Sequence, residues 1–257
     1  MSGRKLPLVM MAALSLGLAV PAGAMSVQEL YAAGNYAAAA KAARGDETAA
    51  NLTLGARSTL VRAAYQADSK DEALMLIADA EADADTALHL APGNAAALLQ
   101  KAAAIGYRAQ LTKSPSLGKR ALRLMVQAAN ADPRDAFAQA AIGGWHSGAI
   151  GTLGKFIAGG VVGAKSDRAV EAFEKAIRLD GRDPTYRVFY AVGMVEIGKE
   201  DEAEKLRAIL APAARAKPRD AFERMMKAQA AMLLALVDDE DKFEDAAKAA
   251  KPFAKFL

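Results

Sequence analysis

Two short patterns in this sequence combine residue types that carry out chemistry in other proteins, and each lacks a required partner. Gly154-Lys155 resembles the end of a phosphate-binding loop, but Phe156 follows where such a loop needs serine or threonine. Ser116 and Lys119 have the spacing of a serine nucleophile and its lysine, yet the companion motifs of those hydrolases are missing. We therefore expect no catalysis, and we expect Ser116 to cap a helix after Pro115.

A third pattern concerns metal binding. Asp79, Glu81, Asp83 and Asp85 alternate as in a calcium loop, but the loop's sixth-position glycine is absent and its twelfth position is Leu90. The sequence therefore favours a solvated helix face over a cation site.

The two histidines, His89 and His146, are the only ones in the chain, and nothing in their spacing brings them together. We expect His89 to lie near a helix C-terminus, where a positive charge is favourable. We expect no metal and no cofactor, although a cleft that gathered carboxylates around His146 would revive the hypothesis of an enzyme.

The composition indicates which elements position these residues. The chain has 257 residues, no cysteine and a net charge of +3, and it is 53% hydrophobic but only 6% aromatic. Roughly a quarter of the residues are alanine, the residue with the highest helix propensity. These properties favour an all-α protein and argue against an all-β or disordered chain. The absence of cysteine excludes disulfides, thiolate metal sites and cysteine nucleophiles.

The first 24 residues have the three parts of a secretory signal peptide. Arg4 and Lys5 precede an apolar run over residues 6–20, and a small-residue cleavage site ends at Ala24. The apolar run is shorter than the ~20 residues that span a bilayer. We therefore predict cleavage after Ala24, a periplasmic location, a single domain over residues 25–257 and no membrane span in the cleaved protein.

The remaining chain gives no electrostatic argument for a nucleic-acid partner. Without Arg4 and Lys5 it carries 31 basic and 30 acidic side chains, so no strong basic field remains to attract a phosphate backbone.

One pattern recurs four times along the chain. A small or apolar residue is followed by an apolar residue four positions on, by alanine three further on, and by proline or glycine five beyond that. The first two offsets place these residues on one helical stripe, and the last residue ends the helix. The four copies are Ala80-Ala84-Ala87-Pro92, Ala121-Met125-Ala128-Pro133, Ala169-Phe173-Ala176-Gly181 and Leu206-Leu210-Ala213-Pro218.

A second helix follows each stop. The segment Pro133-Arg134-Asp135-Ala136-Phe137 recurs as residues 218–222. Its aspartate, Asp135 in one copy and Asp220 in the other, should accept hydrogen bonds from the free N–H groups of the first helical turn.

These residues resemble the tetratricopeptide repeat family. The match is closest over residues 169–181, and Leu30, Tyr31, Gly34 and Tyr36 are similar to the hinge of another such unit. The resemblance implies an α-solenoid of antiparallel helix pairs, a right-handed superhelix whose concave groove binds a peptide or protein. An ordinary alanine-rich helical bundle is the alternative.

The repeats depart from the family's ~34-residue period. Pro92 and Pro133 are 41 residues apart, and Pro133 and Gly181 are 48 apart. The excess lies in a glycine-rich insertion over residues 143–166, which holds eight of the chain's 20 glycines and its only tryptophan.

Three interpretations of this insertion stay open. It could be a packed loop or short helix that covers the core, an apolar contact for a ligand or partner, or a hairpin at a membrane surface. The last lacks the basic face of an interfacial helix.

We expect loops or insertions at 112–118 and 143–166. The expected helices cover residues 26–33, 36–43, 47–66, 70–90, 94–111, 117–131, 134–146, 167–180, 184–198, 200–215, 219–236 and 240–250.

The sequence thus predicts a periplasmic, non-catalytic scaffold that binds a protein or peptide in its groove. The alternative is an accessory or carrier protein with a small apolar ligand under the insertion. A closed apolar pocket lined by Trp145 and Phe156 would favour the small ligand, and an open polar groove would favour the peptide. The candidate contact residues are Trp145, His146, Lys155, Phe156, Ile157, Tyr186 and Tyr190.

Overall fold

Helices make up the regular structure of the described chain. The computed structural model describes residues 25–256, and in this range it contains thirteen α-helices and no β-strand. This confirms the all-α prediction. The predicted signal peptide, residues 1–24, lies outside the described residues. Between residues 25 and 256 no helix is both long enough and apolar enough to cross a membrane.

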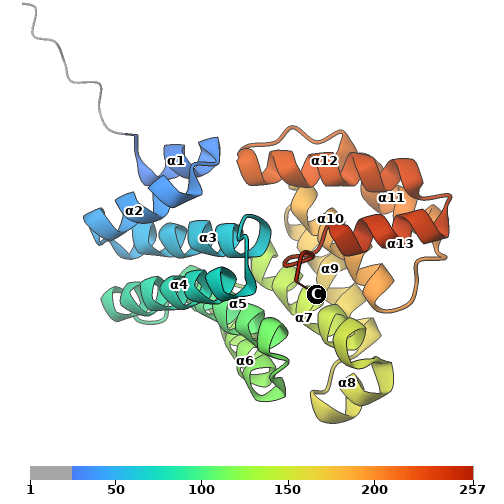
Figure 1. Cartoon of the computed structure of the whole chain (residues 1–257), viewed down its shortest axis with the longest axis horizontal. Coiled ribbons are helices and arrows are strands. Elements are labelled where there is room, and N and C mark those ends of the chain that lie inside the picture. The colour runs from blue at the N-terminus through green and yellow to red at the C-terminus, as the bar shows by residue number, and fades with distance from the viewer. Residues whose placement is uncertain (1–24, 257) are drawn as a thin grey trace, which may run out of the picture.

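The helices follow one another through short connections (Figure 1). In chain order they are α1 (Val27–Ala33), α2 (Tyr36–Asp46), α3 (Ala49–Tyr65), α4 (Lys70–Leu90), α5 (Ala95–Thr112), α6 (Pro115–Ala131), α7 (Ala136–Leu153), α8 (Lys155–Val161), α9 (Ser166–Leu179), α10 (Pro184–Glu196), α11 (Ala203–Ala214), α12 (Ala221–Leu236) and α13 (Glu240–Ala249).

Several boundaries differ from the sequence prediction by two or more residues, and two of them bear on the site. Helix α7 does not end at residue 146 but continues to Leu153, and α8 follows at once, so most of residues 143–166 is helical. Interior glycines cost about 1 kcal/mol each in a helix, but here they let neighbouring side chains approach, because a Cβ atom at Gly143 would lie 2.8 Å from the Phe173 ring. Helix α6 begins earlier than predicted, with Ser114 rather than Ser116 as its cap and Pro115 in its first turn.

The four recurring stripes are buried, as their spacing predicted. Each of the twelve helical positions is less than 9% exposed, and the first and last members of every stripe are almost completely inaccessible. Small side chains at these positions allow close approach of a neighbouring helix. The stripes belong to α4, α6, α9 and α11.

The junction after each stripe has the same construction. Seven residues beyond the last alanine, a polar residue caps the next helix through its side-chain oxygen. The four caps are Asn94, which accepts from Ala97 N at 3.0 Å, and Asp135, Asp183 and Asp220, which accept from Phe137 N, Thr185 N and Glu223 N at 2.8 Å each. The predicted capping by Asp135 and Asp220 is therefore confirmed.

Successive helices pack against one another from α1 to α6, and α7 joins this series to the second series from α9 to α12. The two ends of the chain also meet, because α1 contacts α12 and the Arg224 guanidinium donates to Ala32 O at 3.1 Å. In Figure 1 residues 251–256, which we name the C-terminal strap, return to the centre of the molecule. There Phe253 N donates to Ala64 O at 2.9 Å, and the Phe253 ring packs edge-on against Tyr107.

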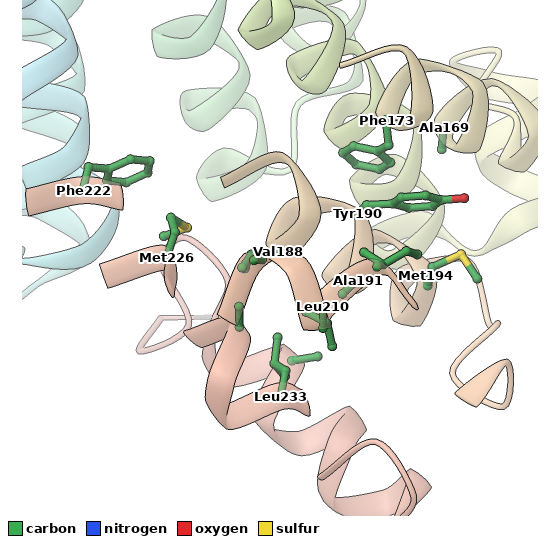
Figure 2. Close-up of a cluster of buried hydrophobic side chains, with 14 of the residues drawn as sticks. Ala169, Phe173, Val188, Tyr190, Ala191, Met194, Leu210, Phe222, Met226 and Leu233 are labelled. Atoms are coloured by element: carbon green, nitrogen blue, oxygen red, sulfur yellow. The ribbon is translucent and has the colours of Figure 1, made fainter. Parts of the chain in front are cut away.

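The largest part of the core lies among α7, α9, α10, α11 and α12. Figure 2 shows Phe173 and Tyr190 lying face to face in this cluster; their ring centroids are 5.4 Å apart and their planes differ by 19°. Gly143 and Gly193 lie close to the Phe173 ring, with added Cβ atoms 2.8 and 2.6 Å from it. The two glycines therefore make the space that the ring fills.

Candidate functional site

A largely apolar cleft of about 250 Å³ lies between the two helix series. Its walls come from α5, the start of α6, α7, α10 and the C-terminal strap. Its larger lining side chains are Tyr107, Met125, Phe137, Trp145, Leu153, Val162, Phe189 and Val192.

One face of α7 forms the floor of the cleft. Phe137, Ala141, Gly144, Gly148 and Thr152 line it at intervals of three and four residues, which places them on one side of a helix. A Cβ atom added at Gly144 would meet nothing within 4 Å. The small residues of this face therefore leave open the space that larger side chains would fill.

Trp145 lies at the wall between α6 and α7. Its indole N–H donates to Gly118 O at 2.7 Å, which satisfies the one polar group of the ring and fixes its orientation. The ring also meets His146 edge-on, with centroids 5.0 Å apart. The chain's only tryptophan thus lines the cleft as a held, apolar surface.

The polar end of the cleft is centred on Glu196. Its carboxylate accepts a hydrogen bond from Ser147 Oγ at 2.9 Å and pairs with Lys251 Nζ at 2.6 Å. Glu196 lies against α7 at Gly148 and Gly151, where an added Cβ atom would be 3.6 Å from its Oε2 and 3.1 Å from its Cβ. This pair connects α10 to the C-terminal strap and gives a mostly apolar cleft a place for a polar group.

The arrangement suits binding. A mostly apolar wall with a few convergent polar groups is typical of small-molecule sites. Within residues 25–256, no group of three or more histidines and carboxylates could hold a metal ion.

The structure separates the seven candidate contact residues. Of these seven, only Trp145 lines the cleft. Lys155, Phe156 and Ile157 are exposed on α8, and Tyr186 and Tyr190 are buried, 7% and 2% exposed. Phe156 is therefore absent from the cleft that Trp145 lines, so the pocket lined by both residues that would favour the small-ligand alternative is not present in this form.

Sequence reasoning missed most of the cleft. Three segments that are distant in the sequence contribute to its lining, through Phe137, Glu196 and Lys251. The spacing of small residues on α7 was a usable signal, because it predicts an open helix face.

His146 points away from solvent and is 8% exposed. Its Nδ1 accepts a hydrogen bond from Lys165 N at 3.3 Å. Burial lowers the pKa of His146 to about 4, and the positive charges of Arg168 and Lys165 act in the same direction. The side chain therefore connects the end of the glycine-rich segment to α7 in its neutral form.

This burial predicts a loss of stability in acid. In the unfolded chain the imidazole has a pKa near 6.5, so between pH 6.5 and 4 the unfolded state binds a proton that the folded state does not. The free energy of unfolding should fall by about 2 kcal/mol between pH 7 and pH 5 from this group alone, as urea titrations at several pH values would measure. His146→Asn should remove this slope, whereas the same change at exposed His89 should keep it. An unchanged slope in His146→Asn would contradict the assignment.

The alternating acids of α4 form the expected solvated face only in part, because Asp79 and Asp85 are exposed whereas Glu81 and Asp83 are not. Asp83 is buried, and both its oxygens accept hydrogen bonds from Arg44 at 2.8–3.0 Å. The remaining acids also have partners on α2 and α5. Asp79 lies 3.9 Å from Arg44, Glu81 pairs with Arg108 at 2.6 Å and Asp85 pairs with Lys101 at 2.5 Å. These carboxylates connect neighbouring helices, an arrangement that periodicity within one helix could not reveal.

The sequence was compared with known protein families and with curated proteins. No known protein family matches the sequence, and no curated protein is similar enough to match it.

Proposed function

We propose that the chain is an exported, non-catalytic binding protein that holds a small, mostly apolar ligand in the cleft between α5, α7 and α10. The observation that carries the proposal is the cleft itself, with Trp145 on its wall and the Glu196–Lys251 pair at its end. The leader-like pattern of residues 1–24 supports export.

The same proposal includes a tetratricopeptide-like architecture. Its support is the four buried stripes and the four identically placed helix caps. In this architecture the helix pairs would form a right-handed superhelix that curls until α1 and α12 touch.

The interior contacts favour a small ligand over a long peptide. Arg57 of α3 lies between the rings of Tyr31 and Phe137, 5.3 and 5.1 Å from their centroids. Phe253 of the C-terminal strap occupies the neighbouring space against α3 and α5. These side chains occupy interior space among α1, α3, α5 and α7, which supports a small ligand rather than a long peptide.

A titration of Trp145 fluorescence tests the proposal. 1-Octanol is a small, mostly apolar probe with one hydroxyl for the polar end of the cleft, so its addition should change the emission of this sole tryptophan and saturate. Gly144→Leu should weaken this binding at least tenfold, because the new side chain occupies the open floor of the cleft. The folded structure should survive, since the added Cβ meets no neighbour.

The matched control is Gly45→Leu on α2, another position where an added Cβ meets nothing within 4 Å. This variant should bind 1-octanol as the unchanged protein does. If emission does not respond to 1-octanol, or if Gly144→Leu binds as tightly as Gly45→Leu, the cleft is not the ligand site.

A further inference from the structure

Helix α8 presents the most exposed large apolar side chain of the described chain. Phe156 is 96% exposed, and Ile157 and Val161 on the same short helix are 56% and 45% exposed. In Figure 1 the helix stands at the edge of the molecule, away from the two helix series. Soluble surfaces seldom gather such side chains without a contact to make.

The charges on the segment that carries this tip are mainly basic, and the first acidic residue after it is the exposed Asp167. Between Gly148 and Ser166 the chain contains Lys155 and Lys165 and no acidic residue. Both lysines are exposed, and neither forms an ion pair with any residue from 25 to 256. The segment has no basic face of the kind that an amphipathic interfacial helix carries, but a lysine at each end of an apolar tip still suits a surface that is apolar inside and negatively charged outside.

The size and shape of the tip favour a bilayer over a protein partner. A stable protein interface buries about 800 Å² on each side and involves 20 or more residues, whereas this patch consists of three side chains on a projecting helix. Insertion of a few apolar side chains between lipid headgroups needs no complementary pocket.

The tip is also continuous with the cleft. Leu153 and Val162, which flank α8 in the chain, both line the cleft. The backbone turns at both ends of α8 through glycines with positive φ, Gly154 at 77° and Gly163 at 78°. These turns set the helix off from the body while its two ends remain at the cleft wall.

We propose that α8 docks the protein on an anionic lipid bilayer, with Phe156 and Ile157 inserted among the headgroups and the cleft facing the membrane. An apolar ligand could then pass between bilayer and cleft beside Leu153 and Val162. This last step rests on the proposed function, whereas docking itself does not.

Flotation with lipid vesicles tests the docking. The chain from Met25 onward should bind vesicles of phosphatidylglycerol and phosphatidylethanolamine and bind pure phosphatidylcholine at least tenfold more weakly. Phe156→Ser combined with Ile157→Ser should reduce binding to the anionic vesicles at least tenfold. Met75→Ser provides the matched control, because Met75 is 65% exposed on α4 and far from α8 in the sequence.

Two results would overturn the docking proposal. One is the absence of vesicle binding by the unchanged protein, including the case in which α8 instead mediates self-association that light scattering detects and the double variant abolishes. The other is equal vesicle binding by the double variant and the unchanged protein. The 1-octanol titration of Trp145 should be the same in the double variant, so a failure of docking and a failure of ligand binding are distinguishable.

Discussion

Phe173→Ala should lower the free energy of unfolding by about 3–5 kcal/mol, the usual cost of removing a fully buried aromatic ring. The ring is 1% exposed and stacks on Tyr190. It fills the space between Gly143 of α7 and Gly193 of α10, so three helices lose contacts at once (Figure 2). Gly143 and Gly193, which border the ring on two sides, have no side chains that could fill the cavity.

Urea denaturation followed by circular dichroism would measure this effect. The matched control is Phe156→Ala, the same substitution at a site that is 96% exposed, which should leave the unfolding free energy within about 0.5 kcal/mol. A loss of less than 1 kcal/mol in Phe173→Ala would show that the ring does not hold α7, α9 and α10 together.

Arg219→Ala should destabilise the fold by about 3 kcal/mol, because it leaves buried carboxylates without their counter-ion. The Arg219 guanidinium lies 2.6 Å from Glu223 and 3.1 Å from both Asp180 and Asp183. The side chains of Asp183 and Glu223 are only 7% and 5% exposed. We expect the lower end of the range for buried pairs because Arg219 itself is half-exposed. Chemical denaturation at pH 7 would measure the loss.

The pH dependence of the stability loss in Arg219→Ala would show whether an unpaired carboxylate causes it. Burial raises the pKa of Glu223, and removal of Arg219 should raise it further. The folded state then takes up a proton more readily than the unfolded state, so the deficit of Arg219→Ala should shrink as the pH falls from 7 to 5. Adding Glu223→Gln should likewise recover part of the loss at pH 7.

The repeated sequence supplies a control for this prediction. Arg134 occupies the same place in the first copy of the Pro-Arg-Asp-Ala-Phe segment, but its side chain is exposed and forms no ion pair within residues 25–256. Arg134→Ala should therefore leave stability nearly unchanged. Equal losses in the two variants would mean that local helix capping, and not the buried carboxylates, explains the effect.

Much of the fold was predictable because it follows from local rules. Alanine content and the stripe spacing predicted the helices and their buried faces, and Asp135 and Asp220 predicted two of the caps. The prediction of a loop or insertion over residues 143–166 was wrong, because the low helix propensity of glycine was considered without the contacts that other helices make there. Gly143 and Gly151 lie where Phe173 and Glu196 approach α7, and those approaches come from other helices.

The candidate site was predictable only in part. Trp145 stood out as the sole tryptophan, and it does line the cleft. Tyr186 and Tyr190 are equally conspicuous in the sequence, yet both are buried in the helix core. Glu196 and Lys251 look like ordinary surface charges until folding brings them within 2.6 Å of each other. An aromatic candidate such as Trp145 can thus be selected from the sequence by residue type, whereas an ion pair between distant segments cannot.

The contact between α1 and α12 has a consequence for biogenesis. Ala32 and Arg224 are 192 positions apart, and contacts of such separation form slowly because closing a long loop costs entropy. While a ribosome still holds the last helices, Tyr65 of α3 has not yet met Phe222 of α12 and lies open to water. Nascent chains should therefore depend on chaperones and be open to proteases until synthesis has passed Phe253, and then mature in one late, cooperative event.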